Sequence, residues 1–142
     1  MQIARKSLTH AGQMTGFGFH DAVLVALSIA FDRQFEASFR RTDGALVQLR
    51  LTGLGPVGTF GIRNGAIVSD VFAWSLSDVP ADSINQPDGA WGVLFGGDIR
   101  RPEALQHAVE VIIKRAEFSW MVLIECSYGG SLAALCQEVE VS

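Results

Sequence analysis

Four residues of the sequence carry side chains that often perform acid–base or nucleophilic chemistry. His20 is followed directly by Asp21, and an imidazole beside a carboxylate can act as an acid–base pair or as part of a metal site. Asp70 and Cys126 would join this pair if the fold brought all four to one pocket. These residues define an alternative function, a small enzyme or a ligand-binding β-barrel with a pocket near His20, Asp21, Asp70 and Cys126.

Each of these residues also has a simpler structural interpretation. Neighbouring strand residues point to opposite faces, so His20 and Asp21 would not act on one atom. A metal site needs further ligands, but His10 lies in the N-terminal segment and His107 lies off the apolar face of a predicted helix. A cysteine such as Cys126, with no neighbouring base, is usually a small buried apolar residue. We therefore predict no catalytic residue, no metal and no cofactor.

One glycine-rich segment resembles a phosphate-binding loop by its spacing alone. Residues Gly53–Gly58 fit the pattern G-x-G-x-x-G. A dinucleotide-binding loop opens a helix after a strand, whereas Pro56 falls inside this motif and strand-forming residues follow it. The segment is therefore interpreted as a bulged or tightly turned connection.

A second set of residues favours protein recognition. The segment 77–90 is the longest irregular stretch of the main body, and it holds three aspartates. Aromatic anchors with a charged rim are typical of protein-binding surfaces, and tryptophans lie close to both ends of this segment. The predicted binding residues are Trp74, Asp78, Asp82, Asp88 and Trp91. The alternative is that both tryptophans are core residues and that the segment is a solvated acidic loop.

Alternating apolar and polar residues indicate strands through most of the chain. The predicted strands cover 23–31, 35–41, 45–52, 59–63, 66–76, 89–97, 121–128 and 132–141. The first three form a meander, with a hairpin turn at Asp43-Gly44. In the first strand, large residues alternate with small ones, and we expect the large side to pack on the core. Its members are Val23, Val25, Leu27, Ile29 and Phe31.

The residues from 98 to 116 are the best helix candidate. Asp98 is a candidate cap, Pro102 suits a first helical turn, and apolar residues recur at helical spacing. A strand over 103–116 remains the alternative, because Val109, Val111 and Ile113 also alternate. The predicted fold is α+β and mainly antiparallel: a curled sheet of about seven or eight strands, either a sandwich or a partly open barrel, with about one helix near 101–116.

The two cysteines lie in the last two predicted strands. A two-residue turn at Gly129-Gly130 places Tyr128 opposite Ser131. In that register Cys126 and Cys136 lie on opposite faces of the sheet. A disulfide between them is then excluded by geometry.

Composition suggests one soluble domain that buries part of its surface in a second copy. Residues 1–18 show no sustained period and are predicted to be a loose arm, and residues 19–142 are predicted to form a single globular domain. Charged residues make up 18% of the chain, below the usual quarter or so. Because polar cover is thin, we predict a homodimer.

Charge and hydropathy argue against two classes of partner. The 11 basic residues are scattered among 15 acidic ones, for a net charge of −4, whereas nucleic-acid binding needs a concentrated basic surface. The longest largely apolar run, 22–31, is about half of a bilayer span, and no secretory signal is recognisable near the start. We predict no nucleic acid, no membrane and a cytoplasmic location.

Two short patches carry a resemblance. Phe19-His20-Asp21 before a long amphipathic strand, with Ser127-Tyr128-Gly129 and Cys136 near the end, resembles small bacterial proteins. Some of these are similar to immunity proteins of toxin–antitoxin-like competition systems. The resemblance implies a stoichiometric binding protein without catalytic residues. Together with the loop and its tryptophans, it leads us to expect a non-enzymatic protein-binding or assembly module.

Overall fold

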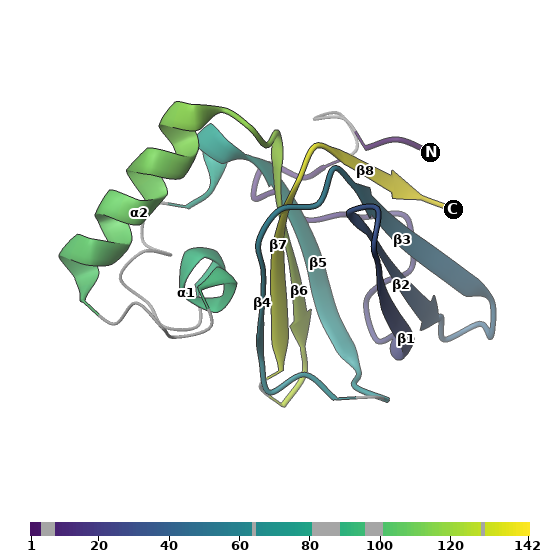
Figure 1. The fold of residues 1–142 in the computed structure, drawn as a ribbon. Coiled ribbons are helices and arrows are strands. Elements are labelled where there is room, and N and C mark those ends of the chain that lie inside the picture. Colours follow the sequence, from purple (N-terminus) through teal and green to yellow (C-terminus); the bar gives the residue numbers. More distant parts are fainter. Residues whose placement is uncertain (4–7, 64, 81–88, 96–100, 129) are drawn as a thin grey trace.

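Two four-stranded antiparallel sheets form the framework of the protein in the computed structural model (Figure 1). The structure describes residues 1–3, 8–63, 65–80, 89–95, 101–128 and 130–142. The first sheet has the order β1-β2-β3-β8, with β1 Val23–Ala30, β2 Gln34–Arg40, β3 Leu46–Thr52 and β8 Glu138–Val141. The second has the order β4-β7-β6-β5, with β4 Val57–Phe60, β7 Ser131–Cys136, β6 Trp120–Cys126 and β5 Val68–Ser75. The helices are the 3-10 turn η2 Leu76–Asp78, α1 Ala90–Leu94 and α2 Pro102–Arg115.

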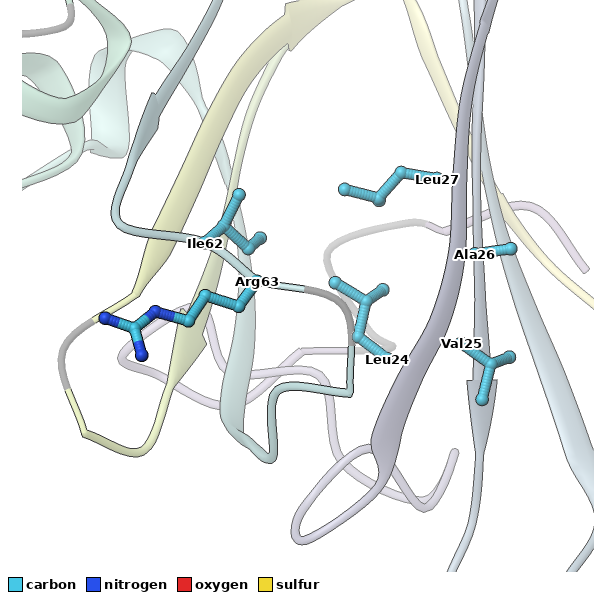
Figure 2. Close-up of a pocket in the computed structure, with 6 residues that line it drawn as sticks. All are labelled: Leu24, Val25, Ala26, Leu27, Ile62 and Arg63. Atoms are coloured by element: carbon cyan, nitrogen blue, oxygen red, sulfur yellow. The ribbon is translucent and has the colours of Figure 1, made fainter.

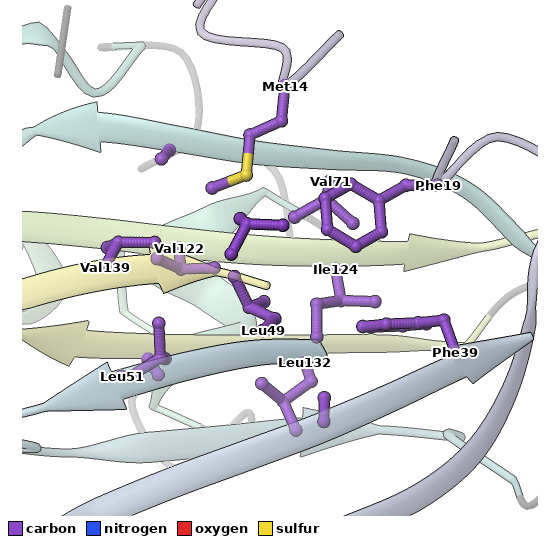
Figure 3. Close-up of a cluster of buried hydrophobic side chains, with 14 of the residues drawn as sticks. Met14, Phe19, Phe39, Leu49, Leu51, Val71, Val122, Ile124, Leu132 and Val139 are labelled. Atoms are coloured by element: carbon purple, nitrogen blue, oxygen red, sulfur yellow. The ribbon is translucent and has the colours of Figure 1, made fainter. Parts of the chain in front are cut away.

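The main hydrophobic core lies between the two sheets (Figure 3). Alternate residues of each strand point inward, and both sheets contribute large apolar side chains to the same cluster. The first sheet supplies Phe35, Phe39, Leu49 and Leu51, and the second supplies Val71, Val122, Ile124 and Leu132. This shared core holds the sheets face to face.

The helices cover the other face of the second sheet (Figure 1). Their buried residues form a second cluster with the outward side chains of β6 and β7. It includes Trp91, Val93, Leu105, Val109, Met121 and Leu135. The second sheet is therefore buried on both faces, which explains why β6 and β7 are apolar at most positions instead of alternating.

Several predictions are confirmed by these elements. The fold is α+β with mainly antiparallel strands, and β1, β2 and β3 form the expected meander. The turn at Asp43-Gly44 has Gly44 at φ +86°, and the Arg41 amide donates to the Ala45 carbonyl at 2.8 Å. The helix predicted near 101–116 is α2, which excludes a strand there. The curled sheet, and with it the partly open barrel, is wrong, because the strands divide into two sheets and neither is closed or curled.

The strand predicted over 89–97 is wrong, because residues Ala90–Leu94 form α1. Four of its five residues are buried and share one helical face. The same run also alternates, and periodicity over so few residues does not separate a strand from a buried helix. The predicted cap Asp98 lies outside the described residues, and the N-cap position of α2 is Arg101.

The strand predicted over 132–141 is two strands, β7 and β8, on different sheets. The break falls at Gln137, whose amide donates to the Thr52 carbonyl at 3.0 Å. β8 pairs with β3 in the first sheet, and β7 pairs with β4 in the second. The β3–β4 and β7–β8 connections therefore both pass from one sheet to the other.

The predicted register of β6 and β7 is also wrong. Ser131 faces Glu125 instead of Tyr128, so the register is shifted by an odd number of residues, and an odd shift exchanges the two faces. Cys126 and Cys136 therefore both belong to the main core. Both thiols are free. Cys136 lies opposite Trp120, at the end of β6 away from Cys126.

The prediction that the large side of the first strand packs on the core is wrong for most of its length. The register with β2 shifts between Leu24 and Ala26, and this β-bulge places Leu24 instead of Val23 and Val25 on the inner face. Leu27 and Ile29 also lie on the inner face, but the core ends before it reaches them. Leu24 is buried at 2% exposure, but Ile29 is 62% exposed and Phe31 is fully exposed.

The N-terminal segment, predicted as a loose arm over 1–18, packs on the sheets in its described part. Ile3 and Met14 are 6% and 4% exposed and belong to the main core. The Ile3 amide donates to the Val139 carbonyl, and the Met14 amide donates to the Val71 carbonyl, both at 2.9 Å. This segment thus lies along β8 and β5, the outer strands on one side of the two sheets.

Candidate functional site

His20 and Asp21 lie at the surface beside the start of β5. Their side chains are 73% and 61% exposed, and His20 Nε2 lies 3.7 Å from Asp21 Oδ2. His20 Nδ1 lies 2.7 Å from the Ser69 carbonyl oxygen. This hydrogen bond, followed by the charges of Asp21 and Asp70, raises the pKa of His20. Three of the four predicted pocket residues are therefore close enough to interact.

Cys126 does not share a cavity with the other three. It is 8% exposed within the main core, and burial raises the pKa of its thiol. The cavity beside it has a volume of about 280 Å³ and is lined by none of His20, Asp21 and Asp70. Among the described residues, no group of three His, Cys, Asp or Glu side chains could hold a metal ion.

The two predicted aromatic anchors are core residues. Trp74 is 8% exposed and Trp91 is 2% exposed. Trp74 Nε1 donates to the Ala11 carbonyl at 2.9 Å, and its ring stacks on Phe72 with the ring centroids 5.2 Å apart. Neither ring offers an anchor to a partner.

The acidic residues near these rings give no further support to a surface there. The Ser75 hydroxyl donates to Asp78 Oδ2 at 2.7 Å, so Asp78 takes part in the local structure of η2. Asp82 and Asp88 lie outside the described residues.

A different candidate surface lies at the outer strands of the sheets. Each sheet has two outer strands, and the N-terminal segment covers β8 and β5. β1 is covered only at its start, where the Leu24 amide donates to the Ala66 carbonyl at 2.9 Å and the Gly65 amide donates to the Leu24 carbonyl at 3.0 Å. From Val25 to Ala30, no described residue outside β2 and the β1–β2 turn forms a backbone hydrogen bond with β1.

This free stretch lacks the usual protection of an outer strand. Soluble proteins usually place charged residues, prolines or a covering segment on such strands, because unpaired backbone groups invite another strand. β1 has the sequence VLVALSIA, without charge or proline. Its bulge, between Leu24 and Ala26, precedes most of the free stretch.

A groove of about 310 Å³ lies beside β1. It is lined by Leu24, Val25, Ala26, Leu27, Ile62 and Arg63. Figure 2 shows Leu24 and Leu27 pointing toward Ile62 across this groove, whereas Val25 and Ala26 point away from it. Arg63 brings the one charged side chain of the lining. We call Val25–Phe31 together with this groove the open edge.

Large apolar side chains of the open edge face solvent. Leu27 is 39% exposed, Ile29 is 62% exposed and Phe31 is 108% exposed. Single exposed apolar residues are normal on protein surfaces. Three within five residues, at the end of a strand with an unpaired backbone and in the turn that follows, form a patch of the kind that marks an interaction site.

The sequence predicts a strand over 23–31 but not that its edge is open. The feature that marks the edge is the uncharged run from Ala22 to Phe31, whose large residues the alternation assigns to the core. Only the register with β2 and the course of the second sheet show that the core ends near Leu24.

Comparison of the chain with protein-family models, curated proteins and solved structures finds no match. Two residues of the short patches Phe19–Asp21, Ser127–Gly129 and Cys136 are core residues, since Phe19 is 2% exposed and Cys136 is fully buried. None of the described helices is long and apolar enough to cross a membrane.

Proposed function

We propose that this chain is a non-enzymatic protein-binding or assembly module that binds its partner along the open edge. The observation that carries the proposal is an uncharged outer strand with an unpaired backbone and exposed Leu27, Ile29 and Phe31. A strand added to β1 would satisfy the backbone groups and cover the apolar side chains. This is β-augmentation, in which the main chain supplies affinity and side-chain pockets supply specificity.

The chemistry-bearing residues support binding over catalysis. His20 and Asp21 are solvated and Cys126 is buried apart from them. A cysteine nucleophile needs a lowered thiol pKa, but burial raises the pKa of Cys126 and raises that of Cys136 to about 12. Neither thiol is activated.

An immunity-like role would be one instance of this function. A stoichiometric inhibitor of a toxin needs a surface that matches its target and needs no catalytic group. In such a role the open edge would be that surface.

Site-specific photocross-linking tests the proposal. A photoreactive amino acid placed at Ile29 should give a discrete protein adduct in cells of the source organism. The matched position is Leu46, which is 66% exposed on β3 outside the open edge, and it should give no such adduct. Equal labelling at the two positions, or none at Ile29, would contradict the proposal.

A further inference from the structure

We infer that the occupant of the open edge is a second copy of this chain, paired antiparallel along β1 about a twofold axis at Ser28. This inference rests on the proposed function and names its partner. The strand carries no charge, it can pair with itself in register, and the same chain holds both an exposed side chain and a groove that could receive it.

The free strand suits pairing with its own copy because it carries no charge. Residues directly opposite on paired strands interact, and like charges there destabilise the pair. The strands β2, β3 and β8 carry Glu36, Arg50 and Glu140, whereas the run from Ala22 to Phe31 has no charged residue. Two copies can therefore join along β1 without like charges opposite each other on the paired strands.

An axis at Ser28 uses the regular free part of the strand, Ala26–Ala30, completely. Ser28 then lies opposite its own copy, and Leu27 lies opposite Ile29 of the second copy. Leu27 and Ile29 lie opposite Ala37 and Phe35 of β2. Because Ala37 and Phe35 are buried in the core, Leu27 and Ile29 belong to the inner face of the sheet. Twofold pairing would place these apolar side chains of the two copies side by side.

In the same register, the exposed Phe31 ring of one copy lies beside the groove of the other. Phe31 follows the end of β1 and is 108% exposed. The axis at Ser28 places it opposite Val25 of the second copy, beside the groove that Leu24 and Leu27 line. A dry cavity of roughly 150 Å³ can hold benzene, so a groove of about 310 Å³ has room for a phenyl ring. By symmetry, each copy would supply one ring and one groove.

The buried area is of the order that a specific dimer requires. An aromatic side chain can bury about 150–250 Å², and a specific interface takes roughly 800 Å² from each partner. Phe31, Ile29, Leu27 and the backbone of five strand residues supply a large part of that area. A low charged fraction of 18% agrees with a surface that is covered in the assembly.

Substitution of Ser28→Cys tests the axis directly. Directly opposite residues in antiparallel strands have Cα atoms about 4.5–5.5 Å apart, within the range of about 4.4–6.8 Å that a disulfide spans. Both native cysteines are buried. The full-length variant, purified and oxidised with copper phenanthroline, should run as a disulfide-linked dimer. The unsubstituted chain should not, and its sedimentation should give twice the mass of one chain.

Matched cysteine positions separate this register from random contact. Thr59→Cys lies exposed on the outer strand β4 and should remain monomeric on oxidation. Ala26→Cys and Ala30→Cys should each cross-link weakly alone but form a mixed disulfide when combined, since the axis places Ala26 opposite Ala30 of the second copy. Cross-linking of Thr59→Cys equal to that of Ser28→Cys would overturn the register.

The outcomes also separate this inference from the proposed function. If the chain sediments as a monomer and Ser28→Cys does not cross-link, the second copy is overturned. In that case an adduct of Ile29 with a different polypeptide keeps the open edge as a binding surface. A monomer without any Ile29 adduct overturns both.

Discussion

Leu27 of β1 lies directly opposite Ala37 of β2, so the two side chains share one face of the sheet, yet Ala37 is fully buried and Leu27 is 39% exposed. The core between the sheets thus ends between neighbouring strands. This relationship defines the open edge.

Truncation of a side chain should cost stability at the core but not at the open edge. Leu49→Ala removes a fully buried side chain and should lower the free energy of unfolding by about 2–5 kcal/mol. Ile29→Ala should cost the monomer less than about 1 kcal/mol, because the side chain is 62% exposed. Urea denaturation of dilute protein measures both values. Equal losses would mean that Ile29 already packs in the monomer core.

Gly58→Ala should destabilise the contact between α1 and the second sheet. A Cβ at this position would lie 2.0 Å from the Val93 carbonyl oxygen and 2.3 Å from that of Leu94. Backbone must move to relieve this overlap, at a cost of about 1–3 kcal/mol. Thr59→Ala, at the exposed next position, is the control. Urea midpoints of the two variants that coincide would show that α1 does not lie this close to β4.

His20 should titrate above its ordinary pKa of about 6.5. The Ser69 carbonyl, Asp21 and Asp70 all favour the protonated ring. A raised folded-state pKa means that the stabilising contribution is present below the unfolded pKa and is lost as the pH rises through the folded pKa. Asp21→Asn should lower the pKa of His20 in an NMR titration, and Glu103→Gln on α2 should leave it unchanged. A pKa of His20 at or below 6.5 would contradict this geometry.

The two thiols should differ in reactivity in the folded protein. Cys136 is fully buried and burial raises its pKa to about 12, whereas Cys126 is 8% exposed with a pKa raised by the same cause. A thiol reagent at pH 8 should label Cys126 slowly and Cys136 more slowly still, and denaturant should release both. Mass spectrometry of labelled peptides gives the order. Faster labelling of Cys136 would show that β7 opens before the end of β6.

Local patterns predicted the elements well where they were long or had a strong turn signal. The meander, the turn at Asp43-Gly44 and α2 follow from alternation, a glycine with positive φ and helical spacing. The fold class followed from these elements. Each of these features depends on residues close together in the sequence.

The errors have long-range causes. The bulge between Leu24 and Ala26 and the odd register shift of β6 with β7 both exchange the faces of a strand, and neither is marked by a distinctive residue. The register that excluded a disulfide is wrong, yet both cysteines are free, because Cys136 pairs with Trp120 at the end of β6 opposite to Cys126. Trp74 and Trp91, predicted as binding residues with a core position as the alternative, are core residues because α1 and α2 cover this face of the second sheet.

Hydrogen exchange of the β1 amides is the most direct measurement of the open edge as a docking surface. By NMR, the amides of Ala26–Ala30 that do not bond to β2 should exchange slowly at concentrations where the partner is bound. They should exchange rapidly in an Ile29→Lys variant that keeps its fold. Rapid exchange of these amides in the unsubstituted protein under all conditions, equal to that of Ile29→Lys, would contradict the account.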